Sequence, residues 1–174
     1  MPSFRQILTQ FHDKVTARTI ADTIASQPDR LPELMDCFFD ENIRICQRAA
    51  WPLGMLGETH AHLLYPYLPQ MIDAVRKPLH NAVIRNVLRT FQYMDFPEEV
   101  EGEVFDLCMS KLMDQSQAIA VKAFSMTVCA NICMKYPALA AELIPVLEEI
   151  IPHGSSGVKA RGRKLLVQLR KIAP

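Results

Sequence analysis

The sequence predicts an all-α chain, a right-handed solenoid of about four stacked helical pairs behind an N-terminal helical cap. The first observation is a repeated segment, in which Arg48, Arg85 and Lys122 stand at intervals of 37 residues and Arg161 follows after 39. The second is that apolar residues recur at helical spacing, without the alternation that strands show. A fixed period of this length is typical of stacked helical units rather than one globular core.

The segment that precedes this repeat follows the same interval. Leu31-Pro32-Glu33-Leu34-Met35-Asp36 is matched 37 residues later by Leu68-Pro69-Gln70-Met71-Ile72-Asp73. Extending the interval along the chain gives four apolar columns, which we expect to form the core of the stack. The columns are Leu31, Leu68, Phe105 and Ile144; Leu34, Met71, Cys108 and Leu147; Phe38, Val75, Leu112 and Ile151; and Ile45, Ala82, Ile119 and Val158.

The predicted organisation of residues 1–174 is one repeat domain with a cap at 1–29 and repeats at 31–60, 61–96, 97–137 and 138–174. The cap is predicted as two helices, Phe4–Phe11 and Val15–Ser26, which end at Gln27-Pro28-Asp29. It fits the apolar columns poorly. That is expected of a terminal unit whose outer face meets water instead of a neighbour.

The first two repeats carry prolines that predict where helices begin and bend. The helices of the first repeat meet near Asp40-Glu41-Asn42. Pro52 predicts a kink or a late start in the second helix, because proline removes a backbone donor and crowds the preceding turn. In the second repeat, Tyr65-Pro66-Tyr67-Leu68-Pro69 predicts a stiff start, and Lys77-Pro78 predicts the turn.

The last two repeats show helix-start and loop patterns. Phe96-Pro97 begins the third repeat, whose first helix opens with glutamates at 98, 99, 101 and 103, which favour a helix N-terminus. Ser116 is predicted to cap the second helix. Tyr136-Pro137 closes this repeat. In the fourth, His153-Gly154-Ser155-Ser156-Gly157 predicts a flexible loop that holds the extra residues of the longer interval.

The composition narrows the possible functions. Lys+Arg and Asp+Glu both number 19, so no global field draws the chain to nucleic acid or to an anionic membrane. The N-terminus lacks the pattern of a secretory signal and no apolar run is long enough to span a bilayer, so we expect a cytoplasmic protein. The cysteines are odd in number, form no paired C-x-x-C motifs and are expected to be buried thiols. They are Cys37, Cys46, Cys108, Cys129 and Cys133.

These residues resemble the HEAT and armadillo-type repeat families. The shared features are a proline early in the first helix, an aspartate near its end and an arginine-containing segment that ends in glycine. The best copy joins Leu31-Pro32 and Asp36 with the stretch from Arg48 to Gly54, and the resemblance extends from about residue 31 to the C-terminus. The third copy departs from it, with Ser110 in place of the aspartate. The resemblance implies an architecture, because family members include scaffolds, transport receptors, phosphatase subunits and lyases.

The cations at equivalent positions of the four repeats form a basic column, which is the main candidate binding site. Stacking the repeats could align its cations along one groove, which would suit an acidic peptide or a phosphate backbone. The alternative, which we favour, is a structural ladder in which each cation pairs with an acidic or polar column on the first helices. The basic column is Arg48, Arg85, Lys122 and Arg161, and the acidic or polar column is Asp36, Asp73, Ser110 and Glu149.

Two further candidates and the C-terminal helix have both binding and structural interpretations. Arg89 and Trp51 are secondary binding candidates. Trp51 with Tyr65 and Tyr67 could form a platform for a peptide or a flipped base, but we expect Trp51 to pack between helices. The basic side chains of the last helix are expected to be a solvated outer face rather than a nucleic-acid contact. They are Lys159, Arg161, Arg163, Lys164, Arg170 and Lys171.

Patterns of catalytic or metal-binding residues are not found. His60 and His62 are two residues apart, so on a helix they point to different sides. Cys129 and Cys133 share a helix face with apolar residues, which favours core packing over a thiol site. The remaining histidines, His12, His80 and His153, are isolated. We therefore predict no enzymatic activity, no cofactor and no metal site.

The expected function is a non-catalytic scaffold that binds a protein or peptide partner on the concave surface formed by its second helices. One alternative is a nucleic-acid-binding protein, because Arg48-Ala49-Ala50-Trp51 resembles the Arg-Ala-rich helix of HEAT-like alkylpurine DNA glycosylases. The zero net charge disfavours that alternative. Another alternative is a homo-oligomeric structural protein, whose open ends bury apolar surface against each other.

Overall fold

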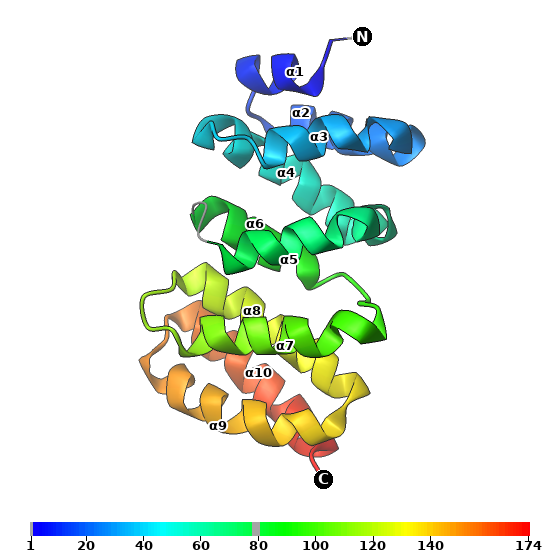
Figure 1. The fold of residues 1–174 in the computed structure, drawn as a ribbon. Coiled ribbons are helices and arrows are strands. Elements are labelled where there is room, and N and C mark those ends of the chain that lie inside the picture. The colour runs from blue at the N-terminus through cyan, green and yellow to red at the C-terminus, as the bar shows by residue number, and fades with distance from the viewer. Residues whose placement is uncertain (1, 78–80) are drawn as a thin grey trace. The chain divides into compact units, whose positions relative to one another are not determined.

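The computed structural model describes residues 2–77 and 81–174, and all regular elements in these ranges are helical (Figure 1). This confirms the prediction of an all-α fold with sequentially packed helices. No helix in the described ranges is both long and apolar enough to cross a bilayer. Pro78 of the predicted Lys77-Pro78 turn and the isolated His80 lie outside the described residues.

The chain forms two compact units, residues 1–94 and 95–174. In the first unit, α2, α4 and α6 pack as one layer, while α3 packs on α4 and α5 on α6. The predicted cap helices are confirmed to within a residue at each end. The helices are α1 (Phe4–Gln10), α2 (Lys14–Ser26), α3 (Leu31–Phe38), α4 (Ile43–His60), α5 (Leu68–Arg76) and α6 (Asn81–Phe91), with 3-10 helices at Pro28–Arg30 and Ala61–Tyr67.

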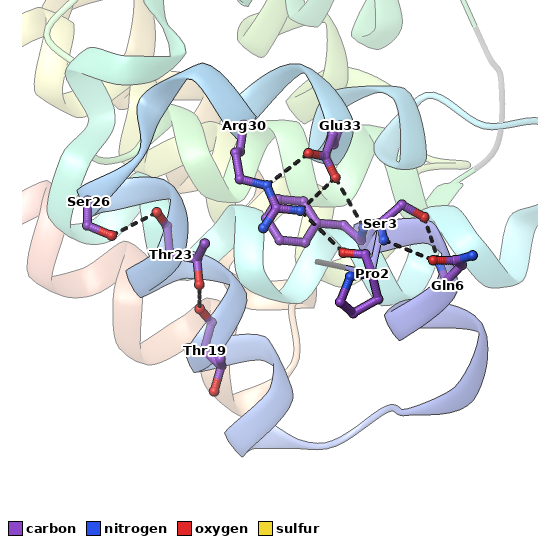
Figure 2. A network of polar contacts seen from close by, with 9 residues as sticks. Pro2, Ser3, Gln6, Thr19, Thr23, Ser26, Arg30 and Glu33 are labelled. Atoms are coloured by element: carbon purple, nitrogen blue, oxygen red, sulfur yellow. Dashed lines mark hydrogen bonds and ion pairs between the residues drawn. The ribbon is translucent and has the colours of Figure 1, made fainter.

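A polar cluster holds α1 against α3 (Figure 2). Ser3 caps α1 by accepting the Gln6 N–H at 3.3 Å, while the Gln6 side chain accepts the Ser3 N–H at 3.0 Å. Glu33 of α3 accepts the Phe4 N–H at 3.3 Å and binds Arg30 Nε at 2.9 Å. The Arg30 guanidinium lies 4.1 Å from the centre of the Phe4 ring. Capping, ion pairing and cation–π contact therefore fix the cap at one point.

The second unit contains two helical pairs. Helix α7 packs on α8, α9 packs on α10, and α8 lies beside α10. The first turn of α7 carries Glu98, Glu99 and Glu101, as predicted. The helices are α7 (Glu98–Met113), α8 (Ile119–Lys135), α9 (Ala140–Ile150) and α10 (Ser156–Ile172), with 3-10 helices at Pro137–Leu139 and Ile151–His153.

Most of the predicted apolar columns form the cores of the two units. The column of Leu34, Met71, Cys108 and Leu147 has no exposed surface at any position. Ile144 and Ala82 are half-buried. The repeat pattern predicts that Ile119 is buried, but it is 60% exposed, because it is the first residue of α8 and lies at the edge of a hollow in the surface of the second unit.

Helix α4 continues through Pro52, so the predicted late start at this proline is wrong. Asn42 caps the helix by accepting the N–H groups of Arg44 and Ile45 at 3.0 and 3.4 Å. Pro52 itself is buried, and α4 packs against α2 on one side and α6 on the other. Tertiary packing along the whole helix stabilises the turn that the proline weakens.

Two predicted loop features also differ from the structure. Ser116 does not cap α8; its N–H and hydroxyl both donate to the Asp114 carboxylate, at 2.9 and 2.7 Å. The hydrogen bonds from Gln117 and Ser116 hold the pKa of Asp114 at about 2. Helix α10 begins at Ser156, with Ser155 as its cap, so Gly157 is helical rather than part of a loop.

Candidate functional site

Arg48 on α4 bonds to the backbone of the cap. Its Nη1 donates to the carbonyl oxygens of Leu8 and Thr9, at 2.7 and 2.9 Å. Both carbonyls lie near the C-terminal end of α1, where no intrahelical donor follows. The predicted structural role of Arg48 is thus retained, but its partners are carbonyl groups and not a carboxylate.

Arg161 on α10 makes similar backbone contacts in the second unit. Its Nη1 donates to the Ala123 carbonyl at 3.0 Å and to the Thr127 hydroxyl at 3.3 Å, both on α8. Its guanidinium lies 5.6 Å from the centre of the Phe124 ring. The half-buried Arg161 side chain therefore joins α10 to α8.

Arg89 and Gly54 belong to one contact between α4 and α6. Arg89 Nη2 donates to Glu58 Oε1 at 3.0 Å. A Cβ atom added to Gly54 would lie 3.4 Å from the Arg89 guanidinium carbon, which is close to ordinary van der Waals distance. The glycine of the repeated segment thus lies beside an arginine from the next repeat. Glu58 was not among the predicted site residues, because it lies outside the segments from which the repeat was recognised.

Trp51 packs against the cap, in agreement with the expectation that it lies between helices. The half-buried indole contacts the cluster formed by Ala17, Ala21 and Met55. Its ring also meets the His12 ring edge to face, with a centroid separation of 5.5 Å. Part of the indole remains open to solvent beside α2.

Arg85 differs from the other arginines of its column. It is exposed on α6, and in residues 2–77 and 81–174 its side chain has no hydrogen bond or ion pair. Its neighbour one turn on, Arg89, is held by Glu58. The first unit holds two residues of the basic column. Arg48 is bonded to backbone carbonyls, whereas the guanidinium of Arg85 is exposed to solvent.

Lys122 lines a large hollow in the second unit. This hollow, which we call the second-unit hollow, has a volume of about 810 Å³ and lies between the α7–α8 turn and the α9–α10 turn. Met113 and Ile119 on its wall are each 60% exposed. Glu149 also lines it, so both predicted columns reach this hollow, yet the described side chains of Lys122 and Glu149 form no ion pair.

The acidic column does not meet the arginines of the first unit. Asp36 and Asp73 are exposed near the ends of α3 and α5, where they line a smaller hollow of about 380 Å³. Asp73 lies 3.7 Å from Arg76 on its own helix. The predicted carboxylate ladder is therefore wrong for this unit, since Arg48 bonds to carbonyls and the aspartates face elsewhere.

The thiols are buried, as expected. Burial raises the pKa of Cys37 and Cys133 to about 11 and that of Cys46 to about 12. Thiolates are the reactive form, so at neutral pH these groups are poor nucleophiles. In the part of the chain that the structure describes, no three His, Cys, Asp or Glu side chains are grouped to hold a metal ion.

Comparison with known proteins identifies the family but no individual relative. The HEAT repeat domain profile matches residues 4–169, which is nearly the whole chain. No curated protein and no solved structure matches. HEAT repeat domains typically mediate protein interactions and are usually non-catalytic. The repeated interval, the paired helices and the profile together show that the chain belongs to the HEAT repeat domain family.

Proposed function

We propose that this chain is a non-catalytic binding module whose protein or peptide partner contacts the second-unit hollow and the exposed Arg85 on α6. The observation that carries the proposal is the second-unit hollow beside α8. Its volume of about 810 Å³ lies within the range of roughly 300–1,000 Å³ that is usual for ligand-binding clefts. The hollow opens to solvent between the α7–α8 turn and the α9–α10 turn, where a segment of a partner can enter.

The wall of the second-unit hollow combines apolar and polar groups. Met113 and Ile119 place more than half of their surfaces in water, although the repeat pattern predicts that Ile119 is buried. Exposed apolar side chains that gather at a concavity supply the anchors of a protein interface. Lys122 and Glu149 stand beside them and can orient a partner through its charges.

Arg85 supports a similar role for the first unit. Its guanidinium is exposed on a second helix and is not neutralised by any described side chain. A planar fork of donors binds carboxylates well. We propose Arg85 as a contact for an acidic group of the partner, and we assign Arg48, Arg89 and Arg161 to the packing of the repeats.

The test is capture of a partner from a lysate of the source cells by the immobilised protein. The variants are Ile119→Glu and Arg85→Glu, with Val167→Glu and Lys14→Glu as controls. Val167 is 55% exposed on α10 and Lys14 is exposed on α2, and neither residue lines the second-unit hollow or the smaller hollow beside Asp36. Circular dichroism verifies that all four variants are folded.

The proposal expects a protein that wild type and both controls capture and that Ile119→Glu and Arg85→Glu lose. Retention by the folded Ile119→Glu variant would rule out the second-unit hollow as the contact. If the captured molecule is a nucleic acid or a second copy of this chain, the proposal fails in favour of one of the two alternatives.

A further inference from the structure

The smaller hollow, which we call the acidic hollow, lies wholly in the first unit. It has a volume of about 380 Å³ and is formed where the last turns of α3 and α5 approach the 3-10 helix Ala61–Tyr67. Met35 and Ala74 form its floor and are almost completely buried. The hollow belongs to the first helices and the segment before α5, whereas Arg85 belongs to a second helix.

Two equivalent aspartates give this hollow its charge. Asp36 and Asp73 occupy the same position in successive repeats, and both line the hollow. Each stands in the last turn of its helix, α3 or α5. The dipole of a helix disfavours an anion at its C-terminal end and favours a cation there. A bound cation would therefore interact favourably with two carboxylates and two helix ends at once.

Aromatic groups complete the wall. Phe39, which follows α3, and Tyr67, which precedes α5, both line the hollow and are half-buried. Burial, together with the nearby charge of Asp36, raises the pKa of Tyr67, so its hydroxyl keeps its proton and remains a donor at neutral pH. Aromatic walls suit the alkyl stem of a long cationic side chain and can attract its charged end.

Two basic side chains partly offset this charge. Lys77 lines the hollow, and Arg76 lies 3.7 Å from Asp73. Lys77 is exposed and follows the end of α5, so its ammonium can turn into water. Asp36 has no ion pair with any described residue. The acidic hollow thus keeps at least one carboxylate available.

We infer that the acidic hollow binds one basic side chain, a lysine or an arginine, carried by a protein partner. The inference rests on the proposed function only in that the occupant belongs to a protein. Charge complementarity with Asp36 and Asp73 selects the cation, and Phe39 and Tyr67 contact its stem. The partner is thereby expected to present basic groups to the first helices as well as acidic groups to Arg85.

The test is a titration of the full chain with three short peptides, followed by ¹H–¹⁵N spectra. The probes are acetyl-Gly-Lys-Gly-amide, acetyl-Gly-Arg-Gly-amide and acetyl-Gly-norleucine-Gly-amide. The third keeps an alkyl stem and lacks the charge. We expect the amides of Tyr67 and Ala74 to shift with the lysine and arginine peptides and not with the norleucine peptide.

Variants then assign the contact. Asp36→Asn/Asp73→Asn is expected to weaken binding of the cationic peptides about tenfold, since two exposed ion pairs are lost. Asp22→Asn/Asp29→Asn removes two exposed aspartates elsewhere in the first unit and is expected to bind as wild type does. Lys77→Gln is expected to tighten binding about threefold by removing a like charge.

Equal shifts with the norleucine peptide, or unchanged binding by Asp36→Asn/Asp73→Asn, would overturn the inference. If that double variant fails to fold, the comparison of lysine with norleucine on the wild-type chain decides. The titration uses no natural partner, and the capture experiment does not alter the acidic hollow. Failure of one proposal is therefore distinguishable from failure of the other.

Discussion

Arginines at equivalent repeat positions have different roles. Arg48 bonds to two carbonyls of α1, whereas Arg85 is exposed without a bonded partner in the described ranges. The difference follows from the neighbour: the short cap helix α1 ends beside Arg48 and offers its unpaired carbonyls. A guanidinium that satisfies such carbonyls stabilises the helix end, in part through the favourable interaction of a cation with the helix dipole.

We predict that Arg48→Met frays α1. The change keeps an unbranched apolar side chain and removes the donors to Leu8 and Thr9. The expected loss is about 1 kcal/mol, the usual net contribution of such bonds in a partly exposed site. Amide hydrogen exchange of α1 should rise several-fold. The exchange of α10 should not change.

Arg85→Met is the matched control, because it removes an exposed arginine without a described partner. Its effect on hydrogen exchange in α1 should be undetectable. Equal protection of α1 in wild type and Arg48→Met would show that these carbonyl bonds contribute nothing to the attachment of the cap.

At the residue scale, the sequence predicted which positions are buried better than it predicted their partners. The repeat spacing of Leu34, Met71, Cys108 and Leu147 predicts burial, because stacked repeats bring equivalent positions to a core. The partner of Arg48 could not be predicted in this way. Every residue has a carbonyl, so nothing in the side-chain pattern distinguishes Leu8 and Thr9, and charge spacing instead favoured a carboxylate.

At the scale of whole helices, close approach of α4 to α6 requires glycine. A Cβ atom on Gly57 would lie 2.7 Å from Thr90 Cγ2. Thr90 is fully buried, and its hydroxyl bonds to the Asn86 carbonyl at 3.0 Å, so it cannot rotate away freely. By contrast, nothing lies within 4 Å of the corresponding position on Gly102 in α7.

The two glycines should therefore respond to alanine with opposite signs. Gly57→Ala is expected to lower the free energy of unfolding by about 1–3 kcal/mol, as overpacking does. Gly102→Ala is expected to raise it by roughly 0.5–1 kcal/mol, because alanine favours a helix interior. Urea unfolding followed by circular dichroism measures both. A neutral Gly57→Ala would mean that α4 and α6 can separate without cost.

A buried carboxylate joins α7 to α8. Glu101 is 3% exposed, and Lys135 Nζ donates to it at 2.6 Å and also bonds to Asp95. Burial acts to raise the pKa of Glu101, but the hydrogen bonds from Lys135 and Tyr136 and the charge of Lys135 outweigh it, so the pKa is lowered. The ionised group therefore stabilises the fold above its unfolded pKa, and this stability is lost as the pH falls through the folded pKa.

We predict that Lys135→Met reverses the sign of this contribution. Without the ammonium, burial raises the pKa of Glu101, and stability is then lost as the pH rises through that value. The difference in urea midpoint between wild type and Lys135→Met should be larger at pH 7 than at pH 4. The exposed Lys164→Met is the control, and its effect should be equal at both pH values. An equal difference for Lys135→Met would contradict the role assigned to this ion pair.

At this scale, the ends of the helices were predicted less well from the sequence than the helices themselves. The acidic start of α7 agreed with the pattern expected at a helix N-terminus. Ser116 did not, because the carboxylate of Asp114 competes for the same turn and accepts three bonds from Ser116 and Gln117. The local effect of Pro52 favours a break, whereas packing of α4 on both sides decides that the helix continues.

For the whole molecule, the repeat interval predicted the fold class because it recurs over most of the chain, and the family profile over residues 4–169 agrees. The binding site was harder to predict. A hollow forms where turns from different helices meet, and the sequence pattern that places Ile119 in a core column carries no information about that edge.

The zero net charge leads to a prediction about salt. Partner binding through Ile119, Met113 and single charges should weaken less than about tenfold between 50 and 200 mM salt, because the apolar contacts are not screened. A protein that contacts many phosphates loses roughly 10³–10⁵ in affinity over that range. Fluorescence anisotropy with the captured partner, measured at 50 and 200 mM salt, distinguishes these two losses of affinity. A steep loss would favour the nucleic-acid alternative.

The most direct test of partner binding at Arg85 and the second-unit hollow is photocrosslinking in the source cells. A benzoylphenylalanine in place of Arg85 or Ile119 should give an adduct with the same partner protein, because both positions face outward from second helices. The same group in place of Lys14 or Val167 should give none. Adducts from Lys14 or Val167 together with none from Arg85 and Ile119 would contradict the claim that Arg85 and the second-unit hollow contact the partner.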